Sequence, residues 1–169
     1  GIVIPEPRLP QMGHRVYGAA PELPHGDYAA HRIRLGMPQG GEDYAYGDTF
    51  PHEALMDQFG GVDFTKGCYV GQEVVSRMQH RGTARNRVVM VSASGDLPPQ
   101  GADMIADGRP CGTMGSSAGS QGLAMLRLDR VSEAMAKGAG VFAADVPVSV
   151  SIQPWAKFGW PQERTGAQG

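Results

Sequence analysis

The chain has 169 residues, with 15 lysines and arginines, 17 aspartates and glutamates and a net charge of −2. A chain of this length can bury the core of one large domain, or of one small domain and part of another. The balanced charge gives no basis for direct binding to nucleic acid, and no apolar run approaches the roughly 18 residues of a membrane-spanning helix.

The two cysteines, Cys68 and Cys111, are too few for a disulfide framework and lack the paired spacing of a zinc site. A reducing compartment is the simplest interpretation of this usage, so a cytoplasmic protein is predicted. Cys111 lies in a strand-like stretch, and we interpret it as a packing residue.

The chain starts at Gly1 without an initiating methionine and continues directly into the apolar residues Ile2–Ile4. This beginning is typical of a strand that is already under way, so we expect the N-terminus to be a cut within a longer protein. Residues 11–17 can form a second strand, which the stretch Pro21–His25, with its two prolines, should end.

A helix is predicted over residues 27–35, because Asp27 can cap its N-terminus and Gly36 should stop it. Residues 37–50, which are rich in glycine and acidic side chains, are expected to form a surface loop. A short helical turn should follow at residues 51–58.

A second helix is predicted over residues 70–80. Its apolar side chains fall on one helical stripe, and Glu73 can pair with Arg77 one turn later. This pattern places the N-terminal end of the helix near Cys68.

Beyond Gly82 the periodicity changes from that of a helix to that of strands. Short strands are predicted at residues 86–93, 103–106, 109–117, 122–128 and 146–152. Five short strands in succession, joined by turns with glycine, serine or proline, indicate a small antiparallel barrel or sandwich.

We therefore predict an α+β fold in two parts. Residues 1–81 would form an α+β module, and residues 82–169 a small antiparallel β-barrel. After the last strand, Trp155, Phe158 and Trp160 form an aromatic tail that should pack on the body.

The segment Lys66–Arg77 gathers groups that seldom cluster by chance, since a cation, two glycines, a thiol, an amide and a carboxylate lie within eight residues. A thiol just before a helix and next to Lys66 would have its thiolate favoured by the helix dipole and by charge. Cys68 is thus a candidate reactive thiol or metal ligand. On local reasoning alone, a buried small apolar residue is an equal alternative.

The run KGCYVGQEVVSR at residues 66–77 matches the K-G-C-[aromatic]-x-G-Q-E-x-x-x-[K/R] signature of the YgfZ proteins, which are related to the aminomethyltransferase T-protein of glycine cleavage. Residues 32–38 (RIRLGMP), 112–117 (GTMGSS) and 122–127 (GLAMLR) resemble further motifs of this family. The resemblance covers residues 11–153, and the signature is specific because eight of its twelve positions are fixed.

This resemblance implies a fold and a function. The fold would be a partial ferredoxin-like α/β module of the aminomethyltransferase-like folate-binding fold, followed by the small C-terminal antiparallel β-barrel. The function would be that of a folate-binding accessory protein for the maturation or repair of 4Fe-4S cluster proteins, with an indirect effect on tRNA modification. Classical enzymatic turnover is not expected.

The same resemblance implies two cofactors and one partner. Folate, as tetrahydrofolate, would be bound by an arginine that the T-protein also places near folate and by residues of the signature, namely Arg32, Lys66, Gly71, Gln72, Glu73 and Arg77. Cys68 would be the functional thiol or the metal ligand of an iron–sulfur cluster. Because such clusters usually take four protein ligands, the others would come from a partner, an A-type iron–sulfur carrier.

Alternatives remain for two of these residues and for the whole chain. Arg32 can be a surface residue of a helix, and Glu73 can serve only as the ion-pair partner of Arg77. The chain as a whole can also be a folate-dependent aminomethyltransferase of the T-protein class, or a protein-interaction module whose cysteine is structural.

Overall fold

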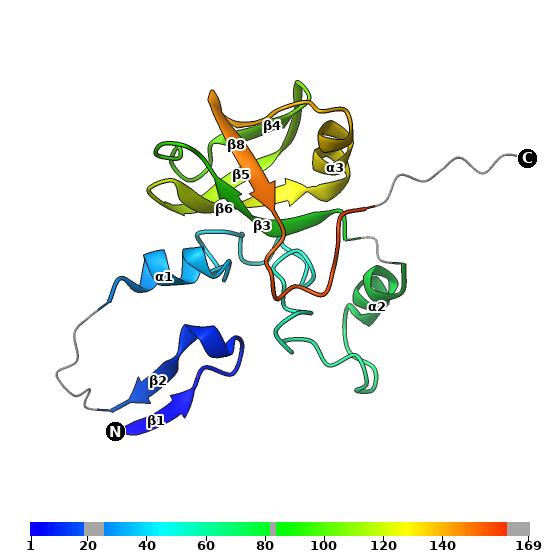
Figure 1. Cartoon of the computed structure of the whole chain (residues 1–169). Coiled ribbons are helices and arrows are strands. Elements are labelled where there is room, and N and C mark those ends of the chain that lie inside the picture. The colour runs from blue at the N-terminus through cyan, green and yellow to red at the C-terminus, as the bar shows by residue number, and fades with distance from the viewer. Residues whose placement is uncertain (19–25, 82–83, 162–169) are drawn as a thin grey trace, which may run out of the picture.

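The computed structural model describes residues 1–18, 26–81 and 84–161, and its largest feature is a closed six-stranded antiparallel barrel (Figure 1). Around the barrel the strand order is β3-β6-β5-β4-β7-β8. The barrel strands are β3 (Asn86–Ser92), β4 (Asp103–Ala106), β5 (Arg109–Ala118), β6 (Gln121–Arg127), β7 (Val141–Ala143) and β8 (Val146–Ser151). The sequence-based prediction of a small antiparallel barrel is therefore confirmed, with one strand more than the five expected.

Two barrel elements escaped prediction. Helix α3 (Leu128–Ala136) follows β6 without a break and buries Val131 and Ala134 in the barrel core. Strand β7 has three residues, too few for an alternating pattern to be visible. Helix α3 ends at Lys137 and Gly138, whose φ angle of +67° is typical of a helix C-terminus, so its end was readable from the sequence.

The strands β3 and β6 bury side chains on both faces. Val89 and Leu126 face the main core inside the barrel, whereas Val88 and Leu123 join Leu55 in a second cluster on the outside. A strand buried on both faces reads as a continuous apolar run, as β3 does. The outer face of β3 and β6 is thus the platform on which the segments before the barrel pack.

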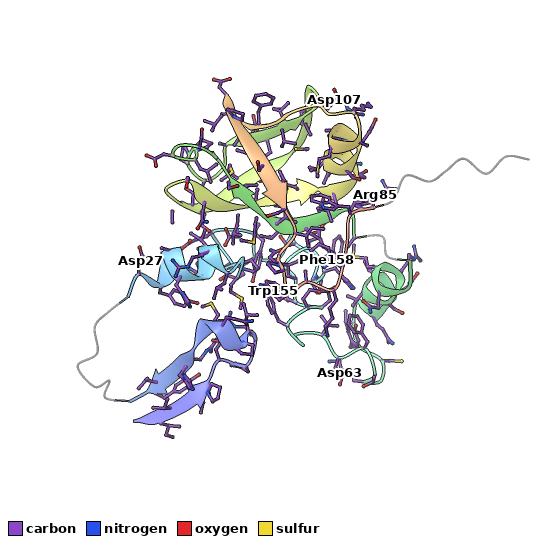
Figure 2. All side chains as sticks on the ribbon, viewed as in Figure 1. Asp27, Asp63, Arg85, Asp107, Trp155 and Phe158 are labelled. Atoms are coloured by element: carbon purple, nitrogen blue, oxygen red, sulfur yellow. The ribbon has the colours of Figure 1, made fainter. Side chains whose placement is uncertain are left out.

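The aromatic tail packs back on the body, as predicted. Trp155 and Phe158 lie against the second cluster, and Trp160 lies against the main core. Figure 2 shows Trp155 and Phe158 between the barrel and the segments beneath it. The indole Nε1 of Trp155 donates a 2.7 Å hydrogen bond to the carbonyl of Leu35, so the tail also reaches helix α1 (Tyr28–Arg34).

Residues before the barrel form separate small elements. Strands β1 (Ile2–Pro5) and β2 (His14–Tyr17) pair as an antiparallel hairpin, with a 3-10 helix at Pro10–Met12 between them. Helix α2 (Gln72–Arg81) is the last element before β3. The prediction of a ferredoxin-like module is not confirmed, since the described residues form one two-stranded hairpin, two helices and a long stretch of turns. The boundary proposed at residues 81 and 82 stays a prediction.

Local predictions in this part have mixed outcomes. Asp27 caps α1 as expected, because its carboxylate accepts a 2.9 Å hydrogen bond from the amide of Ala30. The strand expected at residues 11–17 is shorter, since the 3-10 helix takes up its beginning. The helical turn expected at residues 51–58 is a series of hydrogen-bonded turns. The expected break at Pro21–His25 lies outside the described residues.

Gly36 ends α1 in a way that only glycine allows. Its φ angle is +74°, in the left-handed region, and a Cβ atom there would lie 2.3 Å from the Cγ atom of Gln153. The side chain of Gln153 uses this space to donate a 3.1 Å hydrogen bond to the carbonyl of Gly36 and one of 3.0 Å to that of Val88. The glycine therefore lets α1, β3 and the C-terminal tail meet.

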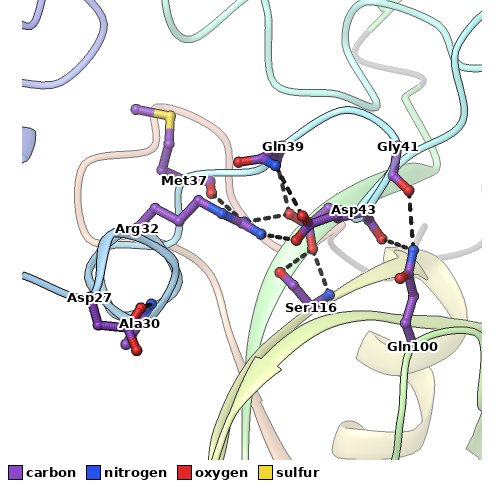
Figure 3. A network of polar contacts seen from close by, with 10 residues as sticks. Asp27, Ala30, Arg32, Met37, Gln39, Gly41, Asp43, Gln100 and Ser116 are labelled. Carbon is purple, nitrogen blue, oxygen red and sulfur yellow. Dashed lines mark hydrogen bonds and ion pairs between the residues drawn. The ribbon is translucent and has the colours of Figure 1, made fainter.

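A buried ion pair fixes α1 to the barrel (Figure 3). The carboxylate of Asp43 accepts hydrogen bonds from Arg32 Nη1 at 2.7 Å, from the amide of Gln39 at 2.8 Å, and from the amide and hydroxyl of Ser116 on β5 at 2.7 and 2.6 Å. Both charged side chains are almost fully buried, with 1% and 0% exposed. Asp43 thus joins a helix, a turn and a barrel strand.

A second buried pair fixes the turns to β3. Arg87 makes a two-pronged contact with Asp57, with hydrogen bonds of 2.9 and 3.0 Å, and donates a third, of 2.9 Å, to the carbonyl of His52. The ring of Phe158 lies 4.2 Å from the guanidinium carbon of Arg87. A planar guanidinium can satisfy all these contacts at once, which a lysine cannot.

No helix in the described residues is long and apolar enough to cross a membrane.

Removing the carboxylate of Asp43 is expected to destabilise the protein strongly. Asp43→Ala leaves the buried guanidinium of Arg32 without its main counter-charge, and breaking a buried pair in this way costs about 3–5 kcal/mol. Glu42→Ala is the matched control, because Glu42 pairs with the same arginine but is 44% exposed, and such pairs contribute about 1 kcal/mol or less. Urea unfolding of both variants measures the difference. Equal losses would show that Asp43 does not organise the fold.

Candidate functional site

The signature lies in a loop and the helix that follows it, which we call the cysteine segment (residues 62–79). Its loop is organised by Asp63, whose Oδ1 atom accepts hydrogen bonds from the amide and hydroxyl of Thr65 and from the amide of Lys66. The hydroxyl of Thr65, and then the backbone amides, lower the pKa of Asp63 below its ordinary value. In Figure 2, Asp63 lies at the far end of the molecule from the barrel.

Cys68 is a free, exposed cysteine in this loop. Helix α2 begins at Gln72, four positions later, so the thiol does not sit directly at the helix N-terminus as we had expected. The ammonium group of Lys66 lies 4.8 Å from the ring centroid of Tyr69, a cation–π distance. The alternative of a buried, purely apolar Cys68 is wrong.

Two other signature residues pair with each other. Arg77 donates a 2.5 Å hydrogen bond to Glu73, one turn earlier on α2, and both side chains are more than half exposed. This confirms the predicted helix and its ion pair. Such an exposed pair contributes about 0.2–0.5 kcal/mol, so neither side chain is committed strongly to the other.

A small cavity of about 90 Å³ lies on the cysteine segment itself. It is lined by Phe64, Tyr69, Gln72, Ser76 and Gln79. Gln72 therefore lies beside a cavity, while Gly71, with a φ angle of +85°, makes the sharp turn into α2. This volume is well below the roughly 300 Å³ at which drug-sized ligand sites begin, so the cavity suits a side chain or a water molecule.

Arg32 lies elsewhere. It belongs to α1, which Figure 1 shows well apart from α2, and its guanidinium is buried against Asp43, Glu42 and the carbonyl of Met37. The structure therefore does not bring Arg32 together with the signature residues. Its Nε atom has no hydrogen-bond partner among the described residues.

A larger pocket that sequence reasoning missed lies beside α1. Its volume is about 300 Å³. It is lined mainly by apolar atoms, from Gln11, Arg34, Leu35, Met90, Pro154 and Trp155. These residues come from four separate parts of the chain, and no local motif joins them. Trp155 was predicted only as a packing residue of the tail, and Arg34 and Leu35 only as part of the motif at residues 32–38.

The described residues contain no group of three or more His, Cys, Asp or Glu side chains placed to hold a metal ion. Cys68 therefore offers one sulfur ligand without neighbours of the same kind in this part of the chain. The other cysteine, Cys111, is buried in the barrel core, and burial raises the pKa of its thiol to about 11.

The barrel part of the chain is similar to a known domain. Residues 85–158 match the family model of the CAF17 C-terminal β-barrel domain. The described barrel is thus of this type, joined to a segment with one exposed cysteine.

The relatives of the whole chain are more specific. It is 32% identical over 174 residues to the human mitochondrial iron–sulfur cluster assembly factor IBA57, covering 95% of this chain and 48% of the relative. It is 29% identical over 213 residues to the IBA57 homologue of Mycosarcoma maydis (94% and 53%), and 34% identical over 145 residues to mouse IBA57 (77% and 40%). The chain spans about half the length of these relatives.

The chain is therefore similar to iron–sulfur cluster assembly factors, which agrees with the coarser prediction of a protein of the aminomethyltransferase-like family. They do not single out the YgfZ proteins within it. The predicted cytoplasmic location is wrong, since the named relatives are mitochondrial proteins. Two unpaired cysteines indicate a reducing environment, but they carry no information on which reducing compartment holds the protein.

The two cysteines should differ sharply in reactivity. Iodoacetamide at pH 8 is expected to label the native protein once, at Cys68, because Cys111 is buried and its pKa is raised. Adding denaturant should expose Cys111 and give two labels per chain. Mass spectrometry of the labelled peptides measures both. Equal labelling of the two cysteines in the native protein would contradict the described core.

Proposed function

We propose that this chain is a folate-binding accessory protein for the maturation or repair of 4Fe-4S cluster proteins, with Cys68 as its functional thiol. The observation that carries the proposal is the exposed Cys68 on a loop in a chain similar to iron–sulfur cluster assembly factors. Any effect on tRNA modification would be indirect, through enzymes that need such clusters.

The single thiol determines how the chain would handle a cluster. Iron–sulfur clusters usually take four protein ligands, and the described residues hold no group of three or more His, Cys, Asp or Glu side chains placed to bind a metal. The cluster would therefore be cargo, held between Cys68 and the ligands of an A-type iron–sulfur carrier.

Folate fits best in the 300 Å³ pocket beside α1. The pocket has the volume at which small-ligand sites begin, a mainly apolar lining and an indole ring, which suit a pterin. Arg34 would pair with an anionic or carbonyl oxygen, and the amide of Gln11 would match the donor and acceptor edge of the ring. Tetrahydrofolate, when bound, would supply one-carbon carrier chemistry at its ring nitrogens.

The residues that the sequence predicted to bind folate have other roles in this proposal. Arg32, buried against Asp43, would act by fixing α1 and hence the position of Arg34. The remaining predicted folate contacts would instead shape the cysteine segment around Cys68; they are Lys66, Gly71, Gln72, Glu73 and Arg77. The competing possibility, that they contact folate there, can be tested by mutation.

The role of Cys68 is tested by anaerobic reconstitution with an A-type carrier, iron and sulfide. The wild type is expected to form a shared cluster with visible absorption, and Cys68→Ser should lose it because the sulfur ligand is gone. Cys111→Ala is the control, since it removes the other thiol without burying an unpaired hydroxyl. It should behave as the wild type. Equal cluster formation in the wild type and Cys68→Ser would remove the thiol from this role.

Folate binding is tested by the fluorescence of Trp155 in a Trp160→Phe background. Tetrahydrofolate should quench this fluorescence, and Arg34→Ala should weaken binding about 10- to 150-fold, because a hydrogen bond to a charged group contributes about 1.5–3 kcal/mol. Arg109→Ala is the control, because Arg109 pairs with Glu133 on the barrel surface. If Lys66→Ala weakens binding and Arg34→Ala does not, folate binds at the cysteine segment. Transfer of an aminomethyl group to folate would instead favour the T-protein type of enzyme.

A further inference from the structure

The cysteine segment is held to the rest of the protein by few contacts. Among the described residues, its hydrogen bonds run almost entirely within the segment, such as those of Asp63 in the loop and the Arg77–Glu73 pair on α2. Val75 is the one buried apolar side chain of α2 in the described part of the chain. Figure 1 shows α2 standing beside the barrel and not packed across its strands. A small number of side chains therefore holds the cysteine segment in its position.

One residue contacts both ends of the segment. The imidazole Nε2 of His52 lies 3.1 Å from the side-chain oxygen of Gln79, on the last turns of α2. The same ring lies 5.8 Å, between centroids, from the ring of Phe64 in the loop. Phe64 precedes Cys68 and Gln79 follows it, so the ring of His52 bridges the segment that carries the thiol.

His52 itself is rigidly attached to the barrel. Its carbonyl accepts the 2.9 Å hydrogen bond from Arg87 on β3, and the next residue, Glu53, accepts a 3.1 Å hydrogen bond from the amide of Val88. The ring of His52 is also buried, with 1% of the residue exposed. A fixed backbone and a buried ring make His52 a firm support for the cysteine segment, which has few other contacts to the rest of the protein.

Only one of the two ring nitrogens of His52 makes a hydrogen bond to the described residues. The side-chain oxygen of Gln79 can only accept, so Nε2 donates in this contact. Nδ1 is buried and has no hydrogen-bond partner among the described residues. An apolar side chain would avoid this unpaired atom, so packing alone does not explain a histidine here. The bond to Gln79 does.

We infer that His52 is a positioning residue that holds the cysteine segment, and with it Cys68, against the barrel through Gln79 and Phe64. This inference rests on the proposed function only in taking Cys68 as the group whose position matters. The contact itself is a property of the described structure. It predicts that the segment can loosen while the barrel stays folded.

Hydrogen exchange of the whole chain tests the inference with variants of Gln79. Gln79→Ala removes the acceptor, and the amides of α2 should exchange about 2- to 10-fold faster, the ratio expected for the loss of one net hydrogen bond. Alanine raises helix propensity, so faster exchange cannot come from a weaker helix. Gln79→Glu keeps an acceptor and should stay close to the wild type. Ser76→Ala, on the same helix and beside the same cavity, is the control and should not exchange faster.

The barrel gives the reference within each experiment. The amides of Val88 and Val89 on β3 should keep their wild-type protection in all variants, which separates loosening of the segment from general instability. Long-range nitrogen NMR should also find the hydrogen of His52 on Nε2 in the wild type. Unchanged α2 exchange in Gln79→Ala, an equal change in Ser76→Ala, or a hydrogen on Nδ1 would each overturn the inference.

The outcomes for His52 and for the proposed function are separable. If Cys68→Ser leaves cluster formation intact while Gln79→Ala speeds α2 exchange, the contact stands and the cluster role falls. If Gln79→Ala leaves α2 exchange unchanged while Cys68→Ser abolishes the cluster, the cluster role stands and the positioning role falls.

Discussion

The carboxylate of Asp43 is the interaction on which the arrangement of the chain depends. Taking a carboxylate and a guanidinium out of water is costly, and the cost is offset only where geometry and additional hydrogen bonds are good. Here Asp43 accepts four hydrogen bonds, from α1, from its own turn and from Ser116 on β5. Because Gly115 next to Ser116 has no side chain, the carboxylate can approach the strand closely; a Cβ atom there would lie 2.4 Å from Asp43 Oδ1. Helix α1 is thereby held at one place on the barrel.

That placement determines where a pocket can form. With α1 fixed, Leu35 presents its carbonyl to Trp155 of the tail, and Gly36 leaves room for Gln153. The pocket beside α1 is the space left between the helix, strand β3, the tail and Gln11 of the 3-10 helix. Helix α1 and the tail are both anchored to the outer face of the barrel, and a ligand bound in the pocket would contact all four parts of the chain.

Sequence patterns predicted what short-range physics controls. The barrel strands predicted from the sequence, the Asp27 cap and helix α2 all depend on neighbours within a few residues, and all are present. Arg32 shows the limit. It was assigned to folate because the family resemblance places it where the T-protein has an arginine near folate, and its partner in the folded chain is not visible in the sequence. Its partner, Asp43, is eleven residues away in the predicted loop of residues 37–50, and no pattern indicated that this loop would bury a carboxylate. The pocket and His52 failed to stand out for the same reason, since their neighbours meet only in the folded chain.

The barrel is tightly packed, whereas the cysteine segment is held by few contacts. The barrel buries its strands on both faces, has a closed sheet and encloses Cys111, whose thiol is thereby kept from reaction. The cysteine segment is the opposite, with an exposed thiol, few buried side chains and two contacts to one histidine. Regions with few buried contacts open locally at low cost, while the core remains closed. A thiol that must meet ligands on another protein benefits from such a segment, because the loop can adapt to a partner without disturbing the fold that positions the pocket.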